Sequence, residues 1–340
     1  MSFINARKYA SLLLCSLVAL IFMMGVLSAQ NISFLRIGTG STAGTYSPIG
    51  TLIASVISSP PGSRACEDGG SCGVPGLIAT AQTTHGSVDN INGVSHGLFE
   101  TALAQSDIIA AAYNGTGIYA KKKPVGNIRV IANLYPEDIH LVVRTDAGIR
   151  TVADLKGKRV SIDSEGSGTR VNALEILNAY GLRLKNIKAV MAGPNKAVTM
   201  MLNGELDAFF FVAGYPAAAV SELADLEIVD LVPIGGKVVE KLVEKTGYYS
   251  LSHIPAGTYR NIDATPTLAV STQWIISEHA SDELVYELTK ALWNPRNRHL
   301  LDRGHSKGLL IHLDTALKGV TVPLHPGAAL YYKQIGLLEQ

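Results

Sequence analysis

The sequence predicts an α/β protein with two lobes, and two observations support this prediction. A strand–loop–helix unit and a helix–strand–loop unit each occur once in either half of the chain. Strands that alternate with helices are typical of parallel sheets with right-handed crossovers. A β-rich stretch also leaves the first half of the chain, and a later one returns to it. Two copies of one plan therefore predict two lobes with similar loops at the carboxyl ends of their strands.

Composition fits this prediction and excludes several protein classes. The chain has 340 residues, of which 47% are hydrophobic and 17% are charged, so a packed core is expected rather than a disordered chain. Its 29 Lys and Arg residues nearly balance its 28 Asp and Glu residues. Without a basic excess, nucleic acid is not an expected partner. The length suits two domains better than one.

The N-terminal segment predicts an export signal. Arg7 and Lys8 precede an uncharged apolar run over 9–27, and small residues end the run at Ala29. This pattern predicts a signal peptide over 1–29 that is cleaved near Ala29. The alternative is an uncleaved anchor, since the run is just long enough to cross a bilayer, which would make the chain a membrane-anchored sensor. The mature chain is expected to be soluble and exported.

The first strand–loop–helix unit begins the mature chain. Residues 33–38 form a short apolar strand, and 39–45 form a loop rich in Gly, Ser and Thr. Apolar periodicity predicts a helix from about Pro48 to Ser58, with the proline near its start.

The second strand–loop–helix unit repeats this order. A strand is predicted over 158–163 and a loop over 164–168. The helix begins near Thr169 and ends before Gly181, a natural stop.

The helix–strand–loop units and the connections complete the plan. The predicted units are 88–97, 99–104 and 105–107 in the first half, and 195–204, 206–212 and 213–215 in the second. Residues 139–143 carry the chain out of lobe 1, 267–276 bring it back, and 281–292 form an amphipathic helix. We therefore predict lobe 1 over 31–140 and 270–340, lobe 2 over 141–269, and hinge strands that cross between them.

The two Ser/Thr/Gly loops are the candidate binding elements. Each loop lies where a strand ends and a helix begins, and there unpaired N–H groups and the helix dipole favour an anion. Facing loops could hold a carboxylate at each end, although Ser and Thr are also ordinary N-caps. Arg170 could pair with a ligand carboxylate or simply solvate the helix face. No phosphate-loop, zinc-protease or EF-hand motif occurs, so neither metal nor cofactor is expected.

Cys66 and Cys72 are the only cysteines of the mature chain and lie in a Gly-rich stretch. In an oxidising compartment two thiols six positions apart should pair, so we expect a structural disulfide.

The chain resembles the TAXI family of TRAP-transporter solute-binding proteins in a series of motifs that keep the family order. The motifs are Gly38-Thr39-Gly40-Ser41-Thr42-Ala43-Gly44-Thr45-Tyr46, Gly86-Ser87-Val88, Gln105-Ser106-Asp107, Tyr113-Asn114-Gly115, Asp154-Leu155-Lys156-Gly157-Lys158-Arg159-Val160, Gly166-Ser167-Gly168-Thr169-Arg170 and Pro323-Leu324-His325-Pro326-Gly327-Ala328. The resemblance implies a type II periplasmic-binding-protein fold, no catalysis and a periplasmic location. It also implies a monomer that delivers a glutamate-like or dicarboxylate solute to a membrane permease.

The resemblance implies a set of ligand-binding residues from both lobes. Together with Arg170, the expected residues are Gly40, Ser41, Thr42, Thr45, Tyr46, Ser87, Gln105, Ser106, Ser167, Gly168, Thr169 and Tyr215. Three features depart from the family pattern: His85 replaces a usual glycine, Tyr215 replaces a common histidine before Pro216, and the segment between the two cysteines looks like an insertion. The rival interpretation is an exported enzyme that acts on a small organic acid, but His85 is the only candidate base near the loops.

Overall fold

A mixed β-sheet is the framework of the structure, a computed structural model that describes residues 32–339. The strands are β1 (Ser33–Gly38), β2 (Ser58–Ser59), β3 (Val74–Pro75), β4 (Leu77–Gln82), β5 (Thr101–Gln105), β6 (Ile128–Arg144), β7 (Arg159–Ser161), β8 (Lys188–Val190), β9 (Ala208–Ala213), β10 (Val229–Leu231), β11 (Ser250–Ile254) and β12 (Thr265–Ser277). The predicted signal peptide and its cleavage site lie outside the described residues.

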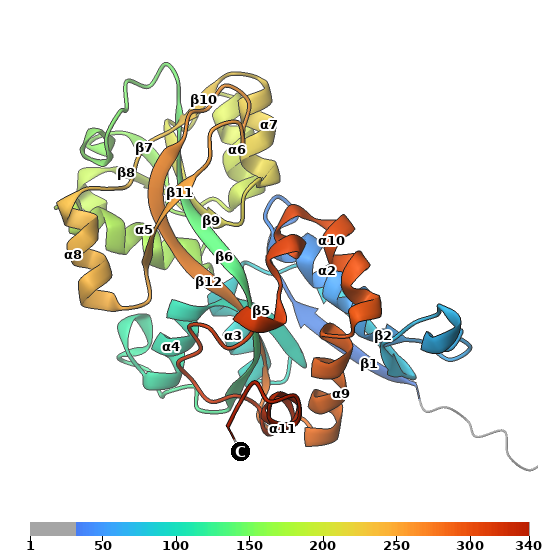
Figure 1. Cartoon of the computed structure of the whole chain (residues 1–340). Helices are drawn as coiled ribbons and strands as arrows, with labels where there is room; N and C mark the ends of the chain where they lie inside the picture. The colour runs from blue at the N-terminus through green and yellow to red at the C-terminus, as the bar shows by residue number, and fades with distance from the viewer. Residues whose placement is uncertain (1–31, 340) are drawn as a thin grey trace, which may run out of the picture. The chain divides into compact units, whose positions relative to one another are not determined.

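Helices cover both faces of this sheet (Figure 1). They are α2 (Tyr46–Ile57), α3 (Ser87–Ser95), α4 (Ser106–Asn114), α5 (Gly168–Ala179), α6 (Pro194–Leu202), α7 (Ala218–Asp225), α8 (Lys237–Thr246), α9 (Asp282–Leu292), α10 (Arg298–Gly304) and α11 (Pro326–Gln334). In the described part of the chain, no helix is both long and apolar enough to span a membrane.

The strand order shows two α/β halves that share their central strands. The half that contains β1, β4 and β5 is called the first half, and the half that contains β7, β8 and β9 is called the second half. Strands β6 and β12 run through both. The order is β4-β1-β5-β12-β6-β9-β7-β8, with β10 paired to β6 and β11 paired to β12. Pairs β1–β4, β1–β5, β7–β8 and β7–β9 are parallel, as predicted. The sheet is nevertheless mixed, because β6 and β12 run antiparallel to each other and to their other partners. The predicted two-lobed α/β plan is confirmed.

The first crossing strand, β6, is much longer than the sequence suggests, whereas β12 nearly matches the predicted 267–276. β6 begins at Ile128 and continues to Arg144, whereas the apolar run predicts only 139–143. Its first part pairs with β12 and its last part pairs with β9. The first part of β6 therefore lies beside β12 and its last part beside β9, so one sheet extends through both halves. The exact lobe boundaries stay a prediction.

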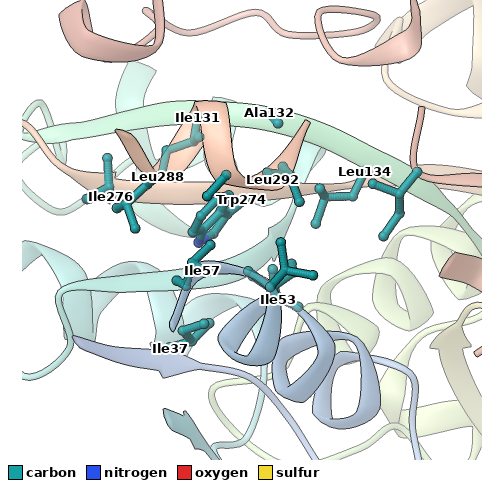
Figure 2. Close-up of a cluster of buried hydrophobic side chains, with 14 of the residues drawn as sticks. Ile37, Ile53, Ile57, Ile131, Ala132, Leu134, Trp274, Ile276, Leu288 and Leu292 are labelled. Carbon is teal, nitrogen blue, oxygen red and sulfur yellow. The ribbon is translucent and has the colours of Figure 1, made fainter. Parts of the chain in front are cut away.

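Each half has an apolar core on both faces of its sheet. In the first half, Trp274 of β12 is fully buried between Ile53 and Ile57 of α2 and the α9 side chains Leu288 and Leu292 (Figure 2). The opposite face is covered by α3 and α4. In the second half, α5 and α8 cover one face and α6 and α7 the other. Buried apolar area of this kind is the main stabilising contribution to such a domain.

Most local predictions are confirmed, and the differences have local causes. Helix α2 begins at Tyr46 rather than Pro48, because proline is tolerated throughout the first helical turn. The segment predicted as a loop over 105–107 is instead the end of β5 and the start of α4. Strand β7 ends at Ser161, and the chain then turns at Asp163, whose φ is 70°. A left-handed residue cannot continue a strand.

The predicted disulfide is present. Cys66 and Cys72 are bonded, with their Cα atoms 4.7 Å apart. The disulfide lies within the Gly-rich loop that connects β2 to β3, and this loop is separate from the two Ser/Thr/Gly loops.

Candidate functional site

A small cavity lies between the two halves, where the loops after several strands converge. The first half lines it with residues 40–41, 44–46 and 85–87, the end of β5 and the middle of β6. The second half lines it with Asp163, the start of α5, Pro194 and β9. The volume of the cavity is about 50 Å³. One water needs roughly 10–15 Å³ by this measure, so the cavity suits a small ligand.

Hydrogen bonds hold the first loop in place at both of its ends. At its start, the N–H of Thr39 donates to the carbonyl of Gln82 over 2.9 Å, and the hydroxyl donates to the same carbonyl over 2.7 Å. At its end, the hydroxyl of Thr45 accepts from the N–H of Gly214 over 3.0 Å. Gly214 belongs to the second half, so this loop is itself part of the contact between halves.

The second loop reaches across in the same way. The carbonyl of Gly166 accepts hydrogen bonds from the N–H groups of Val88 and Asp89, each over 3.0 Å. These two N–H groups belong to the first turn of α3, so the carbonyl occupies the N-terminus of that helix. Ser167 caps α5 by accepting from the N–H of Arg170 over 3.1 Å. The first turn of α5 then faces the cavity at Gly168 and Thr169.

A continuous network of polar side chains joins the halves beside the cavity. Ser87 donates to the amide oxygen of Gln105 over 3.1 Å, and the amide nitrogen of Gln105 donates to Asn172 over 2.6 Å. Asn172 donates in turn to Asp107 over 2.7 Å and to the hydroxyl of Tyr249 over 2.8 Å. All of these side chains are buried. Buried and paired groups of this kind fix one arrangement of the halves.

Three buried carboxyl groups dominate the electrostatics. Burial raises the pKa of Glu137 to about 8 and that of Asp107 to about 7. The pKa of Asp163 is also raised by burial, against hydrogen bonds that favour its charged form. Glu137 and Asp163 line the cavity, and its lining includes neither Lys nor Arg. Removing a carboxylate from water without a nearby cation favours its neutral form.

The structure brings nine of the thirteen predicted binding residues to this one cavity. They are Gly40, Ser41, Thr45, Tyr46, Ser87, Gln105, Ser167, Gly168 and Thr169. Their role in binding stays a prediction, but the two loops do share one cavity, as the sequence suggests.

The other four predicted residues lie elsewhere. The hydroxyl of Thr42 faces the amide of Asn195 at 3.4 Å, and the hydroxyl of Ser106 accepts from the backbone of β12 over 3.2 Å. Arg170 pairs with Glu165 at 3.3 Å and lines a separate hollow with residues of α3. Tyr215 lies under the ammonium of Lys307, which is 3.5 Å from the ring centre. None of the four lines the cavity.

Sequence reasoning missed the acidic lining of the cavity. Glu137 interrupts the apolar segment that runs from Ile128 to Val143, and a charge inside such a run was the available signal. Asp163 directly follows β7 but looks like an ordinary turn residue. The aromatic wall, Phe211 of β9, reads as a core residue because its neighbours Phe209 and Phe210 are also apolar. No group of three or more His, Cys, Asp or Glu side chains could hold a metal ion among the described residues.

A family model described as the NMT1-like family matches residues 37–336. Among solved structures, a protein of Bordetella bronchiseptica RB50 is 17% identical with a TM-score of 0.50, covering 89% of this chain and 80% of that one. The alkanesulfonate-binding protein SsuA from Xanthomonas axonopodis pv. citri is 16% identical, with a TM-score of 0.47 and coverages of 90% and 85%.

PhnD1 from Prochlorococcus marinus, solved with methylphosphonate, is 14% identical with a TM-score of 0.48, covering 79% of this chain and 89% of that one. Identities this low report on the fold alone. The type II periplasmic-binding-protein fold expected from the sequence is confirmed.

Proposed function

Because the chain belongs to the NMT1-like family, which its match over residues 37–336 establishes, we propose that it is a solute-binding protein of a transporter. It captures a small carboxylate solute between its halves and delivers that solute to a membrane permease. The sequence motifs favour a TRAP permease of the TAXI kind and a periplasmic location, with the signal peptide removed near Ala29.

One observation carries this proposal: a single cavity lined by donor-rich loops from both halves. A ligand that contacts both halves stabilises the arrangement in which they touch. The hydroxyl of Thr45, which accepts hydrogen bonds from Gly214 and Tyr135, and the N–H groups in the first turn of α5 supply the donors that a carboxylate needs.

The rival interpretation, an exported enzyme, needs an activated nucleophile or base. His85 is hydrogen-bonded through Nδ1 to Asp89 at 2.6 Å, the arrangement of a general base. Within residues 32–339, however, no hydroxyl or thiol is hydrogen-bonded to its Nε2. Capture of a solute therefore remains the better-supported function.

Thermal unfolding with a panel of amino acids, monocarboxylates and dicarboxylates tests the proposal. A solute at 100 times its Kd should stabilise the protein by about 2.7 kcal/mol. Small-angle scattering should show a smaller radius of gyration with that solute than without it. If no member of the panel raises the melting temperature or changes the radius, solute capture is wrong. Conversion of a bound solute to product would instead support the enzyme.

A further inference from the structure

We propose that Glu137 is the recognition group for a positively charged nitrogen on the ligand, so that the cavity selects zwitterionic amino acids over dicarboxylates of the same length. The inference rests on the proposed function and specifies which of the two expected solute classes this chain takes.

The charges around the cavity are the first argument. Two carboxyl groups, Glu137 and Asp163, line it, and neither lysine nor arginine does. Arg170 is paired with Glu165 outside the cavity, and Lys307 is engaged with Asp138 and Tyr215. Burial raises the pKa of Glu137 to about 8, so the free protein holds this group mostly protonated near neutral pH. An ammonium group beside it would stabilise the ionised carboxylate and release that proton on binding. A second ligand carboxylate would instead bring negative charge to a lining without a cation.

The placement of Glu137 is the second argument. The side chain is 2% exposed, and its Oε2 accepts a hydrogen bond from the hydroxyl of Tyr46 over 2.7 Å. The same hydroxyl lies 3.2 Å from the Oγ of Ser87, which also donates to Gln105. These contacts fix the carboxyl group at the cavity wall. A preorganised acceptor loses little conformational freedom when it binds a donor.

The missing partner of Glu137 is the third argument. No ion pair to this carboxyl group is present among the described residues. Its charged neighbours are Asp107 on α4, Asp138 on β6 and Lys307, and the ammonium of Lys307 is paired with Asp138 at 3.7 Å rather than with Glu137. The Tyr46 hydroxyl gives Glu137 a hydrogen-bond donor, but a buried charge is normally also paired with an opposite charge. A ligand ammonium would supply the cation that the protein does not.

The anionic end of the ligand has a separate place. The N–H groups that begin α3 are already bonded to Gly166, so that helix start is occupied. The first turn of α5, at Gly168 and Thr169, faces the cavity together with the hydroxyls of Ser41 and Thr45. A carboxylate at the α5 start and an ammonium at Glu137 satisfy both regions with one small zwitterion.

Calorimetric titration with matched solutes tests this assignment. L-glutamate is compared with glutarate, and L-alanine with propionate, because each pair differs only by the amino group. The solute with the amino group should bind about 10- to 150-fold more tightly, as expected for a hydrogen bond to a charged group. Glu137→Gln keeps the shape and the contact with Tyr46 but removes the charge, so it should abolish this preference.

Glu222→Gln is the control, since Glu222 is an exposed acid on α7 outside the cavity, and it should leave the preference unchanged. Equal affinity for the two members of each pair overturns the inference while solute capture stands. So does a Glu137→Gln variant that folds normally and weakens both members equally. If neither member of any pair binds, both this inference and the proposed function fail.

Discussion

Gly168 is a residue for which the structure leaves no room for a side chain. A Cβ atom at this position would lie 1.4 Å from the amide oxygen of Gln105 and 3.0 Å from the hydroxyl of Ser87. Gln105 would have to move and lose its hydrogen bond to Asn172. The two halves touch at this point, so the size of one residue decides whether they can close.

We therefore expect Gly168→Ala to weaken solute binding. Loss of the buried hydrogen bonds costs about 1–3 kcal/mol, which corresponds to roughly 5- to 150-fold in Kd. Calorimetric titration with the stabilising solute measures this. Gly126→Ala is the matched control, because a Cβ there meets nothing within 4 Å. If the two alanine variants bind equally well, the contact at Gly168 does not limit closure.

At the scale of single residues, sequence motifs predict the polar lining of the cavity better than its charge. Thr45 and Ser167 lie at helix starts, where local sequence rules apply. Glu137 lies in the middle of a long strand, and only the pairing of that strand with two partners shows where its side chain lies. Its partner Tyr46 is 91 positions away in the sequence, so no local pattern predicts their contact.

A short 3₁₀ element, η6 (Ser306–Leu310), links the C-terminal region to the centre of the molecule. Its Lys307 is 2% exposed, and its ammonium is 3.7 Å from the Oδ2 of Asp138, a carboxyl group on β6 that is equally buried. Burial lowers the pKa of Lys307 and raises that of Asp138, so desolvation outweighs the attraction within the pair. Replacing both members of such a buried pair changes the free energy of unfolding little, whereas removing only one lowers it strongly, because the other charge stays buried without a partner.

Lys307→Met should therefore lower the free energy of unfolding by about 3–5 kcal/mol, because it leaves Asp138 buried without a cation. Adding Asp138→Asn should recover more than half of this loss. Urea denaturation of the single and double variants measures both effects. Lys318→Met, at an exposed lysine, should stay near the wild-type value. Additive losses in the double variant would show that the pair is not coupled.

At the scale of elements, strands and helices with strong periodicity follow from the sequence. The strand over 33–38 and the helix that ends at Leu292 are examples. The extent of β6 does not follow, because Asn133, Pro136, Glu137 and Asp138 interrupt its apolar pattern. Partners on both edges hold this strand together, and that tertiary pairing overrides the local preference of its residues.

At the scale of the whole molecule, the network through Asn172 makes the contact between the halves sensitive to pH. Asp107 lies within it, and burial raises its pKa to about 7 from an ordinary value of 3.8. Between these two values the unfolded chain has released the proton and the folded chain still holds it. Stability therefore falls as the pH rises through this window, and the loss is complete above about pH 7.

Asp107→Asn removes this titration but keeps an acceptor for the Asn172 amide. Between pH 4 and pH 8 the wild type should lose about 2–4 kcal/mol of unfolding free energy relative to the variant. Chemical denaturation at a series of pH values measures the difference. Glu222→Gln should follow the wild type at every pH. Parallel curves for the wild type and Asp107→Asn would mean that Asp107 does not titrate in this range.

The shared strands have a consequence for how the halves can separate. Strands β6 and β12 are paired with each other along 128–138 and 269–277, and they also pair with strands of both halves. The two halves are therefore connected by hydrogen-bonded strands rather than by a flexible linker. Any opening has to flex or twist a hydrogen-bonded ribbon, which resists in proportion to the angle imposed. The bending stiffness of these paired strands therefore limits how far the cavity can open in the free protein.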